Sequence, residues 1–469
     1  MKPLSALILV GGIILTVTSF VAAEKSASPP PNIILILADD LGHGDLSYNG
    51  CQDIKTPHLD KLAGAGLILN DHHTTASVCA PSRAGLMSGK YQQHFGFECN
   101  GPHGKFGLPG SVVTYAEAMK AAGYETMGLG KWHLGSQPEM HPNAQGFDHF
   151  SGFIAGGRSY FPEKKINAEQ MMQRNGKQVP EPEIKYVTNW LTDEAIRLID
   201  HRQKDKPFLM YLSYNAPHTP MHALEEDLAL YRHIDKKNRR TYAAMVHNMD
   251  QNIGRLRRHL EENQLSDNTM VIFCSDNGGA TTNASDNGIY RGMKGSKWEG
   301  GHRVPCIIHW PAGGLTGGKR IGMLTSTLDF MATSLDVAGR KEQIKALGLD
   351  GVSLLPGLQN ISPSKGHDTL YFRRSVAAAV RDGNWKLIRV ENEDLGHRFL
   401  LFDLARDIGE TKDLAKQHPE RVQQLAAKLA TWEKGIQAPA WREGKKWESN
   451  QRKKHHMDVI GREAERKLP

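Results

Sequence analysis

Short, uninterrupted apolar stretches recur along the chain and predict buried strands. They cover residues 32–38, 207–213 and 270–274, and each is too short to be read as a helix. A further strand is expected through residues 127–130. Strands that are apolar on both sides are typical of a parallel sheet whose two faces are covered by helices.

Amphipathic stretches between these strands predict helices. Residues 242–260 carry an apolar side chain every three to four positions, which gives one face of a long helix. Thr114 and Glu117 have the spacing of a capping box, and the helix they open is expected to end near Gly123. Strands that alternate with helices predict an α/β fold with a large, doubly wound, mixed or parallel sheet sandwiched by helices.

The pattern changes after about residue 360. Asp382-Gly383 is a hairpin signal between strand-like stretches at 376–381 and 384–390, and residues 398–404 could add a third strand. Apolar positions at 422–432 follow a helical period. We therefore predict a main α/β domain at residues 32–360 and a smaller C-terminal subdomain, an antiparallel sheet plus a helix, at 361–440.

The N-terminus reads as a targeting segment. Lys2 precedes a mostly apolar stretch at residues 4–21, and small residues at 21–23 suit a cleavage site. Residues 1–23 are thus predicted to be a signal peptide and 24–31 a proline-rich tether. The apolar stretch is nearly long enough to span a bilayer, so an uncleaved anchor is the alternative. We expect an exported protein, periplasmic or secreted, with no stable membrane span after processing.

Composition is that of a globular protein. The chain has 469 residues, of which 39% are hydrophobic and 23% are charged, so a disordered protein is not expected. The formal net charge is +7, and residues 441–469 form a basic tail. This tail lacks interleaved aromatic residues beyond Trp441 and Trp447. A solvated tail, or one that attracts a polyanionic sugar, is therefore preferred to a nucleic-acid-binding segment.

The most distinctive segment is Ser-Val-Cys-Ala-Pro-Ser-Arg-Ala-Gly-Leu-Met-Ser-Gly-Lys at residues 77–90. Pro81 suits the first turn of a helix and Gly89 suits its end. Cys79 would lie at the helix N-terminus, where free N–H groups favour an anion, and Arg83 would follow one turn later. The alternative is a buried cysteine that happens to precede a helix.

Carboxylates follow two of the predicted strands. Asp39 and Asp40 come after the strand at 32–38, and Asp276 and Asn277 come shortly after the strand at 270–274. Ligands of open α/β sheets bind beyond the carboxyl ends of the strands. Adjacent carboxylates repel each other unless a cation lies between them, and oxygen ligands favour Ca²⁺ or Mg²⁺. A helix N-cap is the alternative for Asp39-Asp40 alone.

Three further motifs supply basic side chains near strand ends. Lys131 and His133 are two positions apart after the strand at 127–130, so an extended chain would point them the same way. His218 follows the strand at 207–213. Lys294 precedes a Trp-Glu-Gly-Gly-His run. Each could singly be a residue of an ordinary surface loop.

Residues 77–90 resemble the active-site motif of the type I sulfatases, the formylglycine-dependent, arylsulfatase-like branch of the alkaline-phosphatase superfamily. The resemblance extends over about residues 31–436 and includes secondary motifs at 56–62, 350–355 and 407–410. It makes residues 32–360 the catalytic domain and implies that a formylglycine-generating enzyme converts Cys79 to the aldehyde formylglycine (3-oxoalanine). It also implies one divalent cation, usually calcium, bound by the modified Cys79 and by Asp39, Asp40, Asp276 and Asn277.

The resemblance assigns roles in hydrolysis of a sulfate monoester. The hydrated aldehyde at position 79, a gem-diol, would be the nucleophile, and its second hydroxyl would drive sulfate release. Sulfate charge would be neutralised by Arg83, Lys131 and Lys294. His218, with Lys294, would stabilise or protonate the leaving alcohol. His133 would be the base that removes the proton of the second hydroxyl. The family's sulfate-binding lysine lies five residues before Glu299, which favours Lys294 over Lys297.

The substrate expected for an exported sulfatase is a sulfated carbohydrate. Arg158, His222 and His302 lie near the motifs in sequence and are predicted to contact it. Two alternatives remain open. Formylglycine-dependent relatives include phosphonate monoester and phosphodiester hydrolases, and an unmodified Cys79 would leave a non-catalytic binder of anionic glycans.

Five cysteines are present, and four remain if Cys79 is converted: 51, 99, 274 and 306. An even number fits disulfide formation in an exported protein, but spacing does not settle the pairing. Cys274 lies in an apolar strand, where a buried thiol is equally expected.

Overall fold

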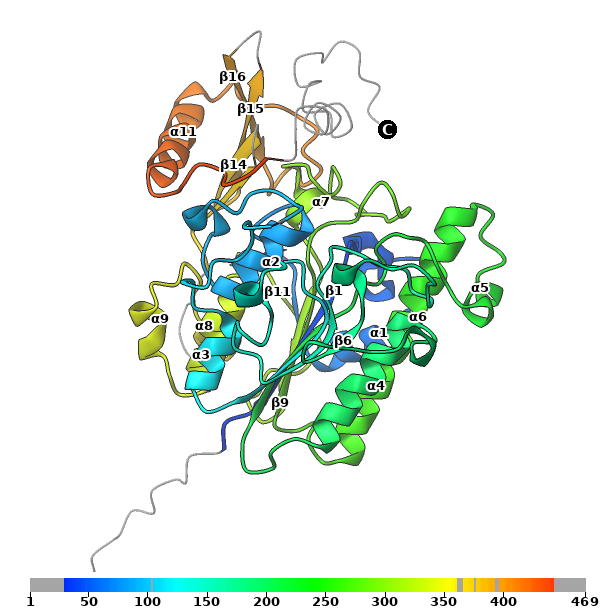
Figure 1. The fold of residues 1–469 in the computed structure, drawn as a ribbon. Helices are drawn as coiled ribbons and strands as arrows, with labels where there is room; N and C mark the ends of the chain where they lie inside the picture. Colours follow the sequence, from blue (N-terminus) through cyan, green and yellow to red (C-terminus); the bar gives the residue numbers. More distant parts are fainter. Residues whose placement is uncertain (1–28, 103, 361–365, 375–376, 393–395, 443–469) are drawn as a thin grey trace, which may run out of the picture.

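The computed structural model describes residues 29–102, 104–360, 366–374, 377–392 and 396–442 (Figure 1). The predicted signal peptide, most of the tether and residues 443–469 of the tail lie outside this part of the chain. None of the helices within it combines the length and the apolar character that crossing a bilayer requires.

A ten-stranded sheet forms the centre of the main domain, in the order β11-β2-β10-β9-β1-β8-β4-β5-β6-β7. The five central strands, from β9 to β5, run parallel to one another, as do β11 and β2. The pairs β9–β10, β10–β2, β5–β6 and β6–β7 are antiparallel. The strands are β1 (Asn32–Ala38), β2 (Leu67–Leu69), β4 (Glu125–Lys131), β5 (His149–Phe153), β6 (Gln173–Arg174), β7 (Lys177–Gln178), β8 (Phe208–Ser213), β9 (Thr269–Ser275), β10 (Cys306–His309) and β11 (Lys319–Ile321).

Strand β1 shows why the apolar stretches become central strands. It lies between β8 and β9, and Ile33–Leu37 are all fully buried. Ile34 and Ile36 pack into one hydrophobic core, whereas Ile33, Leu35 and Leu37 pack into the other. A strand with a core on each face cannot alternate apolar and polar residues. The mixed, helix-covered sheet predicted from the sequence is confirmed.

Helices cover both faces of the sheet (Figure 1). One face carries α1 (Pro57–Ala65), α4 (Val187–Asp200) and α6 (Lys237–Glu262). The other carries α2 (Cys79–Ser88), α3 (Tyr115–Ala121), α8 (Asp329–Val337) and α10 (Leu355–Leu358). The predicted capping box of Thr114 and Glu117 is present at the start of α3. The remaining elements of this domain are α5 (Glu225–Leu230), α7 (Glu299–His302), α9 (Glu342–Ala346), the small parallel pair β3 (His72–His73) and β12 (Thr325–Ser326), and the 3-10 helices η1 (His43–Asp45), η2 (Ser47–Asn49), η3 (Gln92–Phe95), η4 (Pro138–Met140), η5 (Ala168–Gln170) and η6 (Glu181–Glu183).

The C-terminal subdomain is a four-stranded antiparallel sheet with one helix. Its strands, β13 (Thr369–Arg374), β14 (Ala377–Asp382), β15 (Trp385–Asn392) and β16 (Gly396–Asp403), pair in chain order. The predicted turn at Asp382-Gly383 joins β14 to β15. One face packs on α11 (Pro419–Glu433), and the other packs with Trp298 and Leu324 of the main domain. The sheet thus has one strand more than the sequence indicated.

Candidate active site

The carboxylates that follow β1 and β9 lie together at the carboxyl edge of the sheet. β1 and β9 are neighbours in parallel register, so Asp39-Asp40 and Asp276-Asn277 leave the sheet side by side. The backbone N–H of Asp40 donates to Oδ1 of Asp276 at 3.2 Å, and Nδ2 of Asn277 donates to Oδ1 of Asp40 at 2.7 Å. All four side chains are buried. The structure therefore assembles the predicted oxygen ligands into one cluster.

Cys79 is the first residue of α2, and its thiol points at this cluster. Its Sγ atom lies within 4.8 Å of carboxylate oxygens of Asp39 and Asp276, and only 2% of the residue is exposed. Burial raises the pKa of the thiol, but Lys131 and Lys294 outweigh burial and lower the pKa below its ordinary value. The helix ends at Gly89, whose φ of 61° is the left-handed conformation that favours glycine.

Arg83 and Lys131 hold the carboxylates from within the fold. Arg83 donates from Nε to Asp276 Oδ2 at 2.9 Å and from Nη1 to the Lys131 carbonyl at 3.1 Å, and its Nη2 forms an ion pair with the same Asp276 oxygen at 2.8 Å. Lys131 Nζ lies 2.6 Å from Asp39 Oδ2, and all these side chains are fully buried. The guanidinium and the ammonium are thus fixed beside the thiol.

The third cation, Lys294, lies between a carboxylate and the thiol. Its Nζ atom is 2.6 Å from Asp40 Oδ1 and 3.7 Å from Cys79 Sγ. Burial lowers the pKa of Lys294, but Asp40 and Cys79 outweigh burial and raise the pKa above its ordinary value. The ammonium therefore stays protonated over the physiological range.

Two histidines face the cluster. His133 has a φ of 63°, and a Cβ at Gly156 would lie 2.5 Å from its Nε2, so the ring fits only because residue 156 is glycine. His218 Nε2 lies 3.7 Å from Asp40 Oδ2, and its Nδ1 donates to the Thr219 carbonyl. Burial, together with the charge of Lys131, holds the pKa of His133 well below its usual range. Burial also lowers the pKa of His218 to about 4, although the nearby Asp40 carboxylate opposes this shift. Both rings are neutral at pH 7.

The donor set fits a hard divalent cation. Oδ1 of Asp39 and Oδ1 of Asn277 are buried and have no hydrogen-bond partner among the described residues. Burial raises the pKa values of Asp39 and Asp276 in spite of Arg83 and Lys131. Ca²⁺ and Mg²⁺ bind oxygen atoms, and the two Oδ1 atoms accept no hydrogen bond from the described residues that would compete with an ion. A bound cation would also supply the positive charge that the buried carboxylates lack. Asp39, Asp40, Asp276 and Asn277 could therefore hold such an ion.

Two of the three predicted substrate-contacting residues are engaged in local structure. Arg158 is 1% exposed and donates to the carbonyls of Ser159 and Gln170 and to Glu181. His222 is half-buried and contacts Ser159 Oγ at 3.2 Å. Arg158 is thus satisfied within the protein, whereas His222 is partly exposed.

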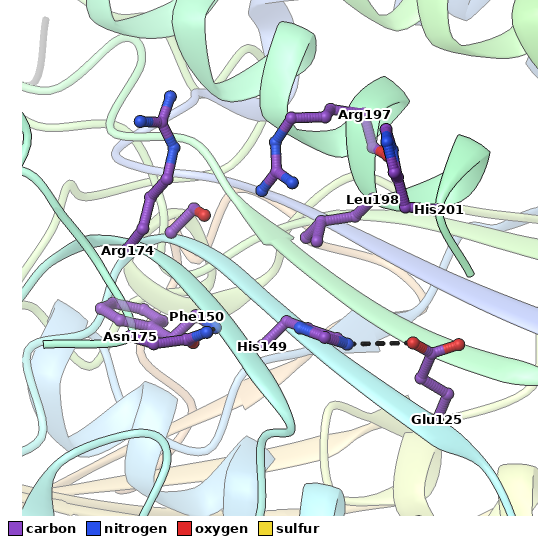
Figure 2. A pocket seen from close by; sticks show the side chains of 9 residues that line it. Glu125, His149, Phe150, Arg174, Asn175, Arg197, Leu198 and His201 are labelled. Atoms are coloured by element: carbon purple, nitrogen blue, oxygen red, sulfur yellow. Dashed lines mark hydrogen bonds and ion pairs between the residues drawn. The ribbon is translucent and has the colours of Figure 1, made fainter. Parts of the chain in front are cut away.

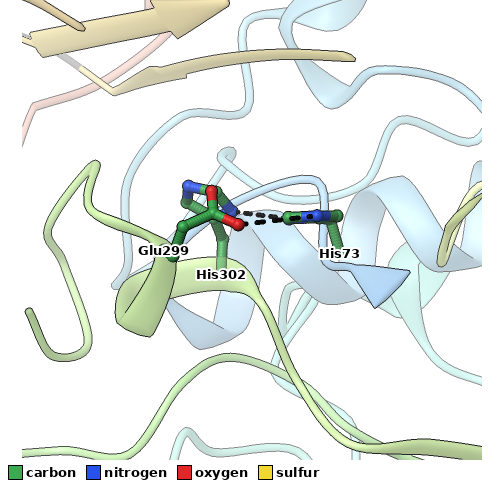
Figure 3. Close-up of side chains that lie close together, drawn as sticks. All are labelled: His73, Glu299 and His302. Carbon is green, nitrogen blue, oxygen red and sulfur yellow. Dashed lines mark hydrogen bonds and ion pairs between the residues drawn. The ribbon is translucent and has the colours of Figure 1, made fainter. Parts of the chain in front are cut away.

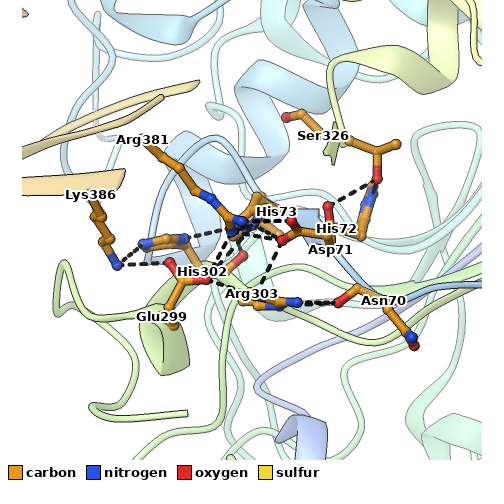
Figure 4. Close-up of polar contacts among 12 residues, drawn as sticks. Asn70, Asp71, His72, His73, Glu299, His302, Arg303, Ser326, Arg381 and Lys386 are labelled. Carbon is orange, nitrogen blue, oxygen red and sulfur yellow. Dashed lines mark hydrogen bonds and ion pairs between the residues drawn. The ribbon is translucent and has the colours of Figure 1, made fainter. Parts of the chain in front are cut away.

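His302, the third, lies in a buried polar network between the main domain and the C-terminal subdomain. Its Nδ1 is 3.0 Å from Nδ1 of His73, with Glu299 beside both rings (Figure 3). Lys386 of β15 reaches Glu299 at 2.8 Å, and Arg381 of β14 reaches the same carboxylate at 3.2 Å (Figure 4). The structure therefore does not bring His302 to a surface where a substrate could bind. The two histidines and Glu299 could geometrically chelate an ion, but two cations of the subdomain already neutralise this carboxylate.

A cavity of about 280 Å³ lies at the opposite end of the sheet (Figure 2). Glu125 and His149, which line it, begin β4 and β5 and pair at 2.9 Å. Its two arginines, Arg174 and Arg197, both bond to Glu194. The cavity is thus remote from the carboxyl edge, and its charges are already paired.

Several residues of the site carry no motif. Ser213 and Tyr211 of β8 accept hydrogen bonds from Arg83, and Asn283 donates to the carbonyls of Asp40 and Pro217. Ser213 is the last residue of β8. Because ligands bind at strand ends, it could have been predicted as a site residue from the sequence. Asn100, whose Oδ1 lies 3.5 Å from Cys79 Sγ, has no such signal because its loop has no periodic pattern.

Comparisons with known proteins agree with this geometry. A family model described as Sulfatase matches residues 31–340. N-acetylgalactosamine-6-sulfatase of Mus musculus is 31% identical over 397 residues, which cover 80% of this chain and 75% of that protein. The uncharacterized sulfatase YdeN of Escherichia coli (strain K12) is 30% identical over 448 residues, which cover 83% of this chain and 78% of that protein.

Solved structures show the same fold over nearly the whole chain. The crystal structure of Ps i-CgsB in complex with k-i-k-neocarrahexaose has 34% sequence identity and a TM-score of 0.82. It covers 92% of this chain and 99% of that one. The shared fold includes the small C-terminal sheet as well as the main domain.

Proposed function

This chain belongs to the sulfatase family and is a sulfuric ester hydrolase, and from that premise we propose that it releases sulfate from a sulfated carbohydrate with a modified Cys79 as nucleophile. The observation that carries the proposal is the position of Cys79 Sγ, within 4.8 Å of carboxylate oxygens of Asp39 and Asp276 and 3.7 Å from the ammonium of Lys294. A thiol alone is a poor group for sulfuryl transfer, but its site has the charges that a sulfate ester needs.

Cys79 is proposed to be converted to formylglycine by a formylglycine-generating enzyme. When hydrated, that aldehyde supplies two hydroxyl groups, one to take the sulfuryl group and one to drive sulfate release. The cation proposed beside it is Ca²⁺, held by Asp39, Asp40, Asp276, Asn277 and the modified side chain, and it supplies Lewis-acid neutralisation of the sulfate oxygens.

The chain's own cations are proposed to bind and orient the sulfate. Arg83 is locked by Asp276 and Lys131 by Asp39, so both present fixed positive charge without reorganisation. Lys294 reaches the thiol position itself. Pre-organised charge in a water-poor site is usually the largest contribution to catalysis.

The two histidines are proposed to handle protons. His133 is neutral at pH 7, so it can accept a proton from the group at position 79. His218 donates a hydrogen bond from Nδ1 to the Thr219 carbonyl, so its Nε2 faces the site without a proton. The protonated amine of Lys294 is therefore proposed to donate to the oxygen of the leaving alcohol, and the bare Nε2 of His218 to stabilise the resulting alcohol by accepting a hydrogen bond from its hydroxyl group.

A sulfated sugar is proposed as the substrate because two similar proteins point to carbohydrates. One is N-acetylgalactosamine-6-sulfatase, and the other is solved in complex with k-i-k-neocarrahexaose. His222 remains a proposed substrate contact because the residue is partly exposed. Arg158 would act only indirectly, through the loop that it supports.

The test is a screen of sulfated mono- and oligosaccharides, read as released inorganic sulfate, with protein from the native host. Release from one class of sugar, together with a mass of the Cys79 peptide that shows the aldehyde, is the expected result. Faster turnover of aryl phosphate diesters or phosphonate monoesters than of aryl sulfates would assign the chain to the alternative hydrolases. An intact thiol and binding without sulfate release would make it a binder of anionic glycans.

Export is proposed from residues 1–23. Sequencing of the mature N-terminus from the native host should find the chain starting near residue 24, in the periplasm or the medium. A mature chain that retains Met1 in a membrane fraction would instead indicate an uncleaved anchor.

A further inference from the structure

The helix that presents Cys79 has no capping side chain of its own. The residue before it is Val78, which cannot accept a hydrogen bond through its side chain. Pro81 has no N–H, and the N–H of Ser82 donates to the Val78 carbonyl at 3.2 Å. The N–H of Ala80 therefore needs an acceptor from elsewhere in the chain, because unpaired first-turn donors are costly when buried.

Asn100 supplies that acceptor. Its Oδ1 atom accepts from the N–H of Ala80 at 3.1 Å, and the same oxygen lies 3.5 Å from Cys79 Sγ. One amide oxygen thus contacts both the start of the helix and the atom that reacts. Asparagine is among the preferred capping residues, but here the cap comes from 20 positions further along the chain.

The loop that carries Asn100 is held by the C-terminal end of the described chain. Trp441 donates from Nε1 to the Asn100 carbonyl at 2.9 Å. Its ring packs edge-on against Phe97, with centroids 4.6 Å apart, and stacks with Phe106 at 5.5 Å. Residue 441 lies far from residue 100 in sequence, so this contact connects the last described residues of the chain to the loop that contacts Cys79.

Trp441 ends a short segment, residues 437–441, which we term the C-terminal strap. The N–H of Gln437 donates to the Gln93 carbonyl, and the N–H of Ala440 donates to the Gly96 carbonyl, both at 2.9 Å. Gly96 has a φ of 72°, and a Cβ there would lie 2.8 Å from the Ala438 carbonyl oxygen. The strap thus lies directly on the chain that leads from α2 to Asn100.

We propose that Asn100 is a positioning residue that caps α2 and orients the side chain of residue 79, and that Trp441 holds Asn100 in place. The inference rests on the proposed role of Cys79 as nucleophile. It gives the strap a part in turnover although Trp441 contacts neither the thiol nor the carboxylates in the described structure. After conversion of Cys79, Asn100 Oδ1 would accept a hydrogen bond from the group at position 79.

The experiment compares Asn100→Ala, Trp441→Phe and the double variant with the wild type. Trp441→Phe removes the N–H donor and keeps a smaller aromatic ring beside Phe97. Asn268→Ala and Trp310→Phe are the control variants, because Trp310 Nε1 also donates to an asparagine, to the side-chain Oδ1 of Asn268 at 3.2 Å, beside the amino end of β9 and away from the site. Conversion of Cys79 is checked by peptide mass in every variant.

Two readouts are taken. The first is hydrogen–deuterium exchange of peptides that contain Ala80, which needs no sulfatase activity. The second is kcat and KM with 4-nitrophenyl sulfate. We expect faster exchange at the start of α2 in both test variants, and kcat lowered about tenfold or more with KM changed little, since small misplacement of a reacting group costs up to about 100-fold.

The double variant should lose no more than Asn100→Ala, because Trp441 is proposed to act only by placing Asn100 Oδ1, which that variant already lacks. Unchanged exchange at Ala80, or losses that add in the double variant, would overturn the proposal. If the wild type turns over no sulfate ester, the proposed function fails, and the exchange data alone then decide whether Trp441 controls the cap through Asn100.

Discussion

The ammonium of Lys294 bridges Asp40 and Cys79, with Nζ 2.6 Å from the carboxylate oxygen and 3.7 Å from sulfur. The contact explains why two lysines so close in sequence differ in role. Lys297, three residues later, is also buried, but its Nζ has no hydrogen-bond partner among the described residues. Of these two lysines, only Lys294 is placed to neutralise charge that develops at position 79.

Lys294→Met should therefore lower kcat/KM for a sulfate ester by at least about 100-fold, the loss found when one pre-organised donor is removed from an active site. Lys297→Met is the matched control, because it removes the same group without touching Asp40 or Cys79. Initial rates of sulfate release measure both. Equal losses in the two variants would contradict the assignment of the sulfate-binding lysine to position 294.

Cys79→Ser tests whether a second hydroxyl is needed at position 79. Serine offers one hydroxyl, so it could take a sulfuryl group but could not expel it by forming an aldehyde. We expect at most a single turnover and a protein heavier by one sulfuryl group, seen by intact mass. Rapid multiple turnover would exclude the proposed nucleophile.

Much of the fold follows from the sequence because burial dictates its pattern. The apolar residues 32–38 predict β1 with its observed bounds, since a strand between two cores must be apolar throughout. Strand β10 was not predicted, because Cys306–His309 is four residues long and nothing in so short a stretch reveals antiparallel pairing with β9. Cys274 and Cys306 face each other across these strands as buried thiols, a pairing that spacing could not give.

The sequence predicts the site residues that directly follow apolar strands, but not those that loops bring to the site. Asp39 and Asp276 follow apolar strands, so the sheet alone brings them together. His302 lies close in sequence to Lys294, but α7 directs its ring towards Lys386 and Phe372 of the C-terminal sheet. Such long-range contacts leave no local pattern.

Removal of one carboxylate should remove the cation. Asp39→Ala or Asp276→Ala takes away an oxygen ligand and leaves Lys131 or Arg83 without its partner. We expect loss of bound calcium, measured by elemental analysis, and activity lowered at least about 100-fold, because the ion contributes several kcal/mol of charge stabilisation. Asp235→Ala, at an exposed aspartate, is the control. Full activity in a chelated, metal-free sample would remove the cation from the mechanism.

Lys386 should stabilise the contact between the two domains. It is fully buried and lies 2.8 Å from both Glu299 and Glu410. Burial raises the pKa of Glu410 to about 7 although Lys386 opposes it, so Glu299 is the partner that stays ionised. Lys386→Met removes one of the buried cations that neutralise the Glu299 carboxylate. It should lower the free energy of unfolding by about 3–5 kcal/mol.

Urea unfolding measures this effect, with Lys412→Met, an exposed lysine of the same subdomain, as the control. The control should change stability by no more than about 0.5 kcal/mol. An equally small change for Lys386→Met would show that the buried network does not stabilise the fold.

Lys297 should make stability depend on pH in the alkaline range. Burial, with Arg374 and Lys386 adding to it, lowers its pKa to about 7, although Glu98 and Cys99 oppose the shift. An unfolded chain has the ordinary lysine value of 10.5, so between pH 7 and 10.5 the unfolded state binds more protons and stability rises with pH. Lys297→Met removes this dependence. The variant should therefore be more stable than the wild type below pH 7, by at most roughly 5 kcal/mol, and the difference should vanish towards pH 10.5.

Urea unfolding of both proteins at several pH values measures the difference, in which the titrations of other residues cancel. A difference that does not vary with pH would mean that Lys297 keeps its ordinary pKa and has found a partner for its charge.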